Sequence, residues 1–175
     1  MKPDAVVVGL RPDAGDTHAD AGVILADHML AARTGSLPAA SRKRTAELIL
    51  DAVGAAVAAH EASGLPAIRD VITSWGGRPD ATVIGTPARV PAHHAALVNS
   101  ALSRAMELDD VHEKALVHAT ATTVPVALAV AEQSGGISGR RFVDAVTLGN
   151  DIACRLALAL DMPSGEPIGG RGSCR

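Results

Sequence analysis

The chain has 175 residues and a formal net charge of −3 at pH 7, and 47% of its residues are hydrophobic but only 1% aromatic. The lack of a basic field and of aromatic platforms for base stacking argues against nucleic-acid binding. Cys154 and Cys174 lack metal or disulfide spacing, and no apolar stretch reaches the roughly 20 residues of a membrane span, so we expect a cytoplasmic protein with free thiols.

The first part of the chain predicts a leader and two helices. Residues 1–20 are rich in Asp, Pro and Gly and predict a loose leader. Apolar residues then recur at helical spacing from Ala21 to near Gly35. Pro38 opens a second helix in the first-turn position that proline tolerates. Gly54 inside that helix costs about 1 kcal/mol relative to alanine, so we expect it to allow close packing against a neighbouring helix.

The middle of the chain predicts a short β excursion between two helices. A third helix is expected over residues 66–75, and a cluster of Gly, Pro and Asp then predicts a turn. The β-branched run that follows predicts an edge or hairpin strand, with the excursion lying near residues 81–90. Pro91 opens a long fourth helix that is expected to reach Met106.

Two more helices complete the predicted fold. An apolar helix is expected over residues 123–132, and Ser138 is a suitable N-cap for a last helix that ends near Leu160. Residues 161–175 show no periodicity and predict an irregular tail. Ala, Val and Leu dominate the apolar residues and favour helices. The fold class predicted is therefore mainly α, a bundle of about six helices.

Two of the predicted helices also bear on assembly. The segments at residues 46–59 and 123–131 are apolar on nearly all sides, and such helices must be buried. Apolar patches larger than several hundred Å² favour association. We therefore expect a homodimer or a larger species.

The densest polar cluster follows the predicted fourth helix. It contains Glu107, Asp109, Asp110, His112 and His118, with further charges between the two histidines. Crowded carboxylates raise one another's pKa, and a nearby histidine can act as acid or base near neutral pH. Proton abstraction next to a carboxylate, followed by loss of a leaving group, needs such groups.

Two other interpretations of the cluster remain open on spacing alone. One is a solvated loop after a helix. The other is a divalent-metal site, but the chain has no H-x-x-x-H or H-E-x-x-H motif, so we expect no metal. Outside the cluster, His94 in the first turn of the fourth helix is a candidate to reach a substrate carboxylate.

A longer run resembles a known family. The segment from Ala95 to Leu156, "AALVNSALSRAMELDDVHEKALVHATATTVPVALAVAEQSGGISGRRFVDAVTLGNDIACRL", is similar to the N-terminal helical domain of the MmgE/PrpD family. The family signature is A-A-x-x-N-x-x-x-x-H-x-x-D-[FY]-D-D-T-H, followed by H-P, an apolar helix ending in A-E, S-G, and G-x-[ED]-[VI]-x-x-R-L. Upstream, "LPAASRKRTAELILDAVGAAVAA" resembles the first long helix of the family. The resemblance covers roughly residues 23–160, and we take residues 21–160 as the domain.

The resemblance implies a function without a redox cofactor. The family includes 2-methylcitrate dehydratase, cis-aconitate decarboxylase and iminodisuccinate epimerase, so it implies a lyase or isomerase acting on a small polycarboxylic acid. It assigns proton transfer and substrate orientation to His118, Glu107 and Asp110, with Asp109 and His112 nearby. Asn99 falls on the Asn of the signature and is expected, with His94, to contact substrate.

The chain also departs from the family pattern. Arg104 stands where the signature has His, Glu107 where it has Asp, Val111 where it has Thr, and Ala119 where it has Pro. Family members are expected to carry a second α+β domain that completes the site. We therefore expect residues 161–175 to reflect a truncation or frameshift, and the chain alone to be inactive. The alternatives are a non-catalytic helical fragment that serves in assembly, and a divalent-metal hydrolase.

Overall fold

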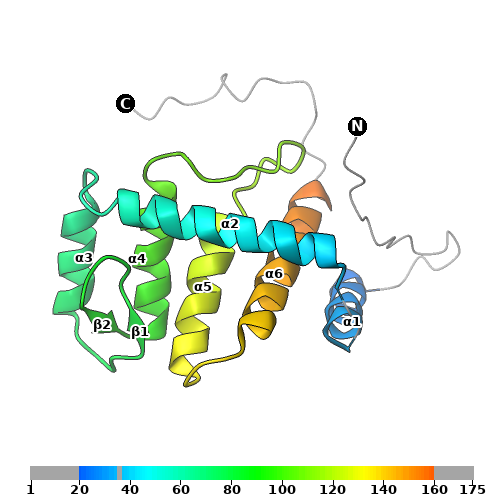
Figure 1. Ribbon diagram of the computed structural model, residues 1–175, viewed down its shortest axis with the longest axis horizontal. Helices are drawn as coiled ribbons and strands as arrows, with labels where there is room; N and C mark the ends of the chain where they lie inside the picture. Colours follow the sequence, from blue (N-terminus) through cyan, green and yellow to red (C-terminus); the bar gives the residue numbers. More distant parts are fainter. Residues whose placement is uncertain (1–19, 35–36, 160–175) are drawn as a thin grey trace, which may run out of the picture. The chain divides into compact units, whose positions relative to one another are not determined.

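A computed structural model describes residues 20–34 and 37–159 of the chain (Figure 1). The predicted leader, apart from Asp20, and the predicted tail lie outside the described residues. The chain divides into two compact units, of which the first ends at Leu37 and the second begins at Pro38. The first unit contains the helix α1 (Ala21–Thr34), as the spacing predicts.

The second unit contains all the other elements, and the prediction of a mainly α fold with one short β excursion is confirmed. The two short strands pair as an antiparallel hairpin, in which Ala81 is opposite Val90. In chain order the elements are α2 (Ala39–Ala58), α3 (Leu65–Ser74), β1 (Ala81–Thr82), β2 (Arg89–Val90), α4 (Ala92–Arg104), α5 (Thr120–Gln133) and α6 (Gly139–Ala159).

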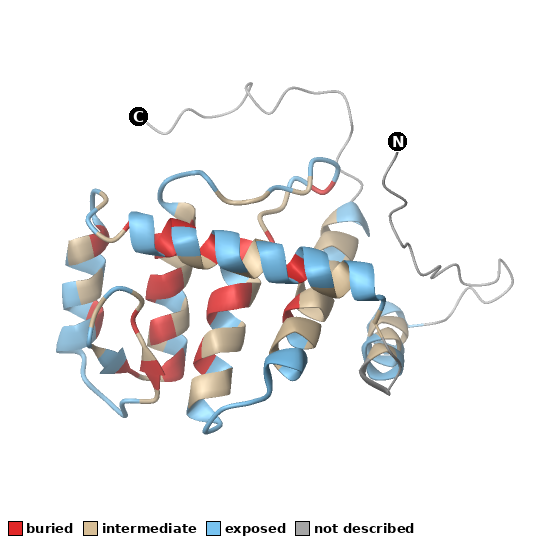
Figure 2. Ribbon diagram, in the orientation of Figure 1, coloured by how far each residue is buried: buried red, intermediate tan, exposed pale blue. Residues whose placement is uncertain are grey.

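Within this unit α4, α5 and α6 lie side by side, and α2 crosses them (Figure 1). The face of α2 that meets these helices is made of small side chains, with Ala52, Ala55 and Ala56 buried. Buried positions gather where α2 crosses α4 and α5 (Figure 2). Small side chains let helix backbones approach closely, so one crossing helix ties the row together.

The core consists of two clusters of apolar side chains. The larger joins α2, α3 and α4 to the hairpin, and its bulkiest fully buried members are Leu102, Val83 and Val98. The smaller cluster joins α2, α5 and α6 around Val124 and Val146. Each buried side chain of this size contributes roughly 1.5–3 kcal/mol. Helix α2 contributes side chains to both clusters and so connects them.

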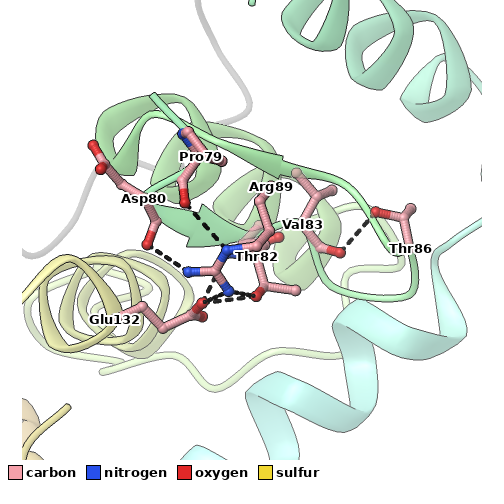
Figure 3. A network of polar contacts seen from close by, with 8 residues as sticks. Pro79, Asp80, Thr82, Val83, Thr86, Arg89 and Glu132 are labelled. Carbon is pink, nitrogen blue, oxygen red and sulfur yellow. Dashed lines mark hydrogen bonds and ion pairs between the residues drawn. The ribbon is translucent and has the colours of Figure 1, made fainter. Parts of the chain in front are cut away.

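A carboxylate clamps the hairpin to α5 (Figure 3). Glu132 Oε2 accepts hydrogen bonds from the backbone N–H of Thr82 at 3.1 Å, its hydroxyl at 2.7 Å, and Arg89 Nη1 at 2.9 Å. Arg89 also donates to the carbonyl oxygens of Pro79 and Asp80, at 3.2 and 2.8 Å. The short strands are thus held by side chains as well as by their ladder.

The helices expected to be buried on all sides are buried on one side only. Leu50 and Val57 of α2 are 74% and 55% exposed, and Val126 and Val130 of α5 are about half exposed. The expectation for Gly54 is wrong: it is exposed, and a Cβ there would meet nothing within 4 Å. Despite this apolar surface, none of the helices in the described ranges is both long and apolar enough to cross a membrane.

Two helix boundaries differ from the prediction and lengthen the connection between α4 and α5. Helix α4 ends at Arg104 rather than near Met106, because Glu107 adopts a left-handed φ of 53° that takes the chain out of the helix. Helix α5 begins at Thr120, one turn earlier than expected, and the Thr120 hydroxyl is buried against Asn150 of α6, which donates to it at 3.0 Å. The connection therefore comprises residues 105–119.

Candidate active site at the α4–α5 connection

The predicted polar cluster lies on the connection between α4 and α5, residues 105–119, which joins the last turn of α4 to the first turn of α5 (Figure 1). Two of its non-glycine residues, Glu107 and Leu116, have positive φ values of 53° and 50°. Residues with a side chain rarely adopt a positive φ, and those that do are concentrated at functional sites. The connection is therefore held in a specific path.

Asp109 is the centre of the cluster. Its side chain is 1% exposed, and its Oδ1 accepts a hydrogen bond from Arg104 Nη1 at 3.1 Å. Its Oδ2 lies 3.0 Å from His118 Nδ1. These last two atoms are close but not aligned as a hydrogen bond, and both are buried without a hydrogen-bond partner among the described residues. A buried carboxylate is costly unless it is paired, and Arg104 supplies the pairing charge.

His118 lies with Nδ1 against this buried carboxylate and with part of its ring exposed. A carboxylate next to one ring nitrogen favours a proton on that nitrogen and leaves the other nitrogen as the acceptor. The His118 side chain is 33% exposed, so its ring is accessible from solvent. In unliganded enzymes catalytic hydrogen bonds are often poorly aligned and tighten when substrate binds. The geometry therefore suits proton transfer to or from a small molecule.

The other predicted residues of the connection surround this pair in different ways. Glu107 is 81% exposed, and its Oε1 lies 3.8 Å from Arg104 Nη2. The ring nitrogen Nδ1 of His112 accepts a hydrogen bond from the backbone N–H of Ala115 at 3.0 Å. The backbone N–H of His112 donates to the Val117 carbonyl at 3.0 Å. His112 thus closes a turn within the connection, whereas the Glu107 side chain is exposed and pairs at long range with Arg104.

His94 and Asn99 are not brought to the cluster. His94 lies in the first turn of α4, with its ring centroid 5.3 Å from that of Trp75. It precedes Arg104 by ten residues, or about 15 Å along the helix axis. Asn99 is 2% exposed; its Oδ1 accepts the N–H of Ile84 and its Nδ2 donates to the Thr82 carbonyl, both at 2.9 Å. Its amide is therefore occupied by the hairpin.

Sequence reasoning missed two residues that interact with the connection. Arg104 was noted only as a departure from the family signature, yet it holds Asp109. Cys154 of α6 was treated as a free thiol of no consequence, yet it lies within electrostatic reach of Asp110. For Arg104 the one sequence signal is a basic residue at a helix end, five positions before an aspartate. The interaction of Cys154 with Asp110 depends on how α6 packs, which no local sequence pattern shows.

The surroundings of Cys154 make its thiol a reporter of this packing. Burial raises the pKa of the Cys154 thiol, and the carboxylates of Asp151 and Asp110 raise it further. The thiolate is the reactive form, so we expect slower alkylation by iodoacetamide at pH 8 than for a free cysteine. Asp110→Asn removes one of these charges, lowers the pKa and accelerates the reaction, but only in part because burial is the larger cause.

The alkylation is measured by mass spectrometry in a Cys174→Ser background, so that one thiol is read. Asp70→Asn, at an exposed aspartate of α3, is the matched control and leaves the rate unchanged. Equal rates for Asp110→Asn and the parent chain would contradict an electrostatic effect of Asp110 on the Cys154 thiol.

Two further features of the described residues bear on the site. No three His, Cys, Asp or Glu side chains among them converge closely enough to hold a metal ion. A shallow depression of about 370 Å³ lies between α3 and the hairpin turn, lined by Arg69, Thr73 and Thr86 among others. Arg69 is engaged there by His60, and no predicted site residue lines the depression.

Comparisons with known proteins agree with the family resemblance of the sequence. Residues 23–166 match the family model described as the MmgE/PrpD N-terminal domain. A cis-aconitate decarboxylase-like protein, oryM, of Aspergillus oryzae is 27% identical to the chain over 134 residues. That alignment covers 73% of this chain and 28% of the relative, so the chain spans little more than a quarter of the relative's length.

Proposed function

Because the chain belongs to the MmgE/PrpD family, we propose that its helical domain supplies the acid–base groups of a lyase or isomerase that acts on a small polycarboxylic acid. The reaction removes a proton next to a carboxylate and, in a lyase, then expels a leaving group. It needs neither a redox cofactor nor a metal. The relative's name points to a decarboxylase of cis-aconitate type, and the family resemblance to a dehydratase of 2-methylcitrate type.

One observation carries the proposal. The carboxylate of Asp109, 1% exposed, lies 3.0 Å from Nδ1 of His118, whose ring remains partly exposed. Here the carboxylate is buried and the imidazole reaches solvent, which is the arrangement of a histidine that exchanges protons with a ligand.

The remaining residues of the cluster have separate roles in this proposal. His118 transfers the proton, and Asp109 orients it. Glu107, exposed on the connection, faces the substrate and acts as the second acid–base group. Asp110 adds negative charge near Cys154 of α6, and His112 closes the turn at residues 112–117.

Substrate binding by the domain tests the proposal directly. In a ¹⁵N-labelled sample of the chain, 2-methylcitrate and cis-aconitate are each expected to shift backbone amide signals of residues 104–118. Propionate, with one carboxylate, is the control and shifts them less at equal concentration. Shifts spread evenly over the chain, or absent from residues 104–118, would contradict the proposal.

Turnover is expected of a longer enzyme, by which we mean a protein that joins this domain to the remainder of the family's architecture. The alignment with the relative covers 28% of that relative. In the longer enzyme a chelator leaves the rate unchanged. Loss of activity with a chelator would favour the metal-hydrolase alternative. A domain that binds neither acid would favour a non-catalytic role in assembly.

The exposed apolar side chains of α2 and α5 support a second part of the proposal, self-association. Leu50, Val57, Val126 and Val130 are each about half exposed or more, and exposed apolar patches of several hundred Å² mark interaction surfaces. We expect light scattering over a concentration series to give a dimer or a larger species. A mass that stays monomeric throughout the series would overturn this expectation.

A further inference from the structure

Arg104 links the end of α4 to the carboxylates of the connection. It is the last residue of α4, where a positive charge is favoured by the helix dipole. Its guanidinium spans two carboxylates, with Nη1 3.1 Å from Asp109 Oδ1 and Nη2 3.8 Å from Glu107 Oε1. The guanidinium is a planar fork with fixed donor directions. The hydrogen bond to Asp109 fixes one arm of this fork, and the longer contact to the exposed Glu107 restricts the other arm less.

The contact with Arg104 determines how Asp109 presents its second oxygen. A carboxylate has two oxygens in one plane, so a hydrogen bond that holds Oδ1 also fixes the direction of Oδ2. In this structure Oδ2 is the atom that lies 3.0 Å from His118 Nδ1. The Asp109 side chain is 1% exposed, so water offers Oδ1 little alternative to the arginine.

The orientation of Oδ2 determines which nitrogen of His118 carries the proton. A lone pair on Nδ1 would repel a carboxylate oxygen at 3.0 Å, whereas an N–H there is attracted to it, whether or not the two are aligned. An N–H on Nδ1 is therefore the favoured form of the neutral ring. In that form the lone pair lies on Nε2, the nitrogen that remains for a substrate.

We propose that Arg104 is a positioning residue, which holds Asp109 so that His118 stays in the Nδ1-protonated tautomer with Nε2 as the proton acceptor. The proposal rests on the proposed function in that His118 is taken as the proton-transfer group. The proposal gives a role to Arg104, which stands where the family signature has histidine.

Nuclear magnetic resonance of the whole ¹⁵N-labelled chain reads the tautomer without any substrate. Long-range ¹H–¹⁵N correlations of His118, assigned by their loss in His118→Ala, are recorded at a pH at which the ring is neutral. The parent chain is expected to show the Nδ1–H pattern. Arg104→Gln keeps a donor but loses the charge and the fork, and is expected to give a mixture with the Nε2–H form. Arg104→Lys, which keeps the charge, restores the Nδ1–H pattern in part.

Arg44→Gln is the matched control, because Arg44 forms an exposed pair with Glu47 on α2 at 3.2 Å, and it leaves the His118 pattern unchanged. An Nε2–H pattern in the parent chain overturns the proposal even if Arg104→Gln fails to fold. An unchanged Nδ1–H pattern in a folded Arg104→Gln chain overturns it as well.

Turnover separates this proposal from the function on which it rests. In the longer enzyme Arg104→Gln is expected to lower kcat by about 10- to 100-fold, the range found when outer partners of metal-bound histidines are removed, with Arg104→Lys in between. Full activity of His118→Ala would defeat the proposed function and leave the tautomer result standing. A tautomer independent of Arg104 would defeat the positioning role and leave the role of His118 standing.

Discussion

Replacing His118 by alanine is expected to lower turnover by roughly 10²- to 10⁴-fold, the usual contribution of a positioned acid–base group. The substitution removes the ring that faces Asp109 Oδ2 at 3.0 Å. It removes little packing, because the side chain is 33% exposed and lies on a connection between helices. Kinetics with 2-methylcitrate and cis-aconitate in the longer enzyme, together with thermal melts of both proteins, measure the two effects separately.

The control for this variant is His28→Ala, since His28 belongs to α1 in the first compact unit. It is expected to leave kcat and KM unchanged. If His118→Ala keeps full activity in an enzyme that retains its melting temperature, then His118 is not the proton-transfer group. A loss of activity that only follows a loss of folding would point to a structural histidine.

Asn99→Leu is expected to lower the free energy of unfolding of the second unit by about 2 to 4 kcal/mol. Leucine has a similar shape but leaves the Ile84 N–H and the Thr82 carbonyl without the partners that Asn99 provides at 2.9 Å. Each buried group left unsatisfied costs roughly 1–3 kcal/mol. We take the lower part of that range because both groups are only partly buried. Urea unfolding followed by circular dichroism measures the change.

The matched control is Ser100→Ala, one residue further along α4 and partly exposed. It changes the free energy of unfolding by less than about 0.5 kcal/mol, as surface substitutions usually do. If Asn99→Leu matched this control and instead weakened substrate binding, the family-based assignment of Asn99 to the substrate would be right. The hydrogen bonds to the hairpin would then be incidental.

The helices were predictable because local chemistry decides most of their limits. Pro38 and Pro91 immediately precede α2 and α4, and Ser138 Oγ accepts the N–H of Arg141 at 3.3 Å at the start of α6. The limits that differ depend on contacts distant in sequence. Thr120 joins α5 because Asn150 of α6 holds its hydroxyl. A local pattern carries no information about that contact.

The candidate site was predictable as a segment but not as a geometry. The density of carboxylates and imidazoles identified the connection between α4 and α5. It did not indicate that Asp109 is the buried member and Glu107 the exposed one, because burial there depends on the left-handed turn at Glu107. Gly54 shows the opposite error, since a helix-interior glycine suggested close packing and the structure leaves the position open.

The turn within the connection, residues 112–117, has a consequence for how such a protein diversifies. The backbone of His112 accepts from Leu116 at 2.7 Å and donates to Val117 at 3.0 Å. The turn therefore closes on itself, and Glu113, Lys114 and Leu116 project into solvent at its tip. Ala115 is 7% exposed and Leu116 has a positive φ of 50°, so only the side chains of Glu113 and Lys114 can vary without disturbing the turn. Substitutions at these two positions would alter what meets an incoming molecule while the turn that precedes His118 keeps its path.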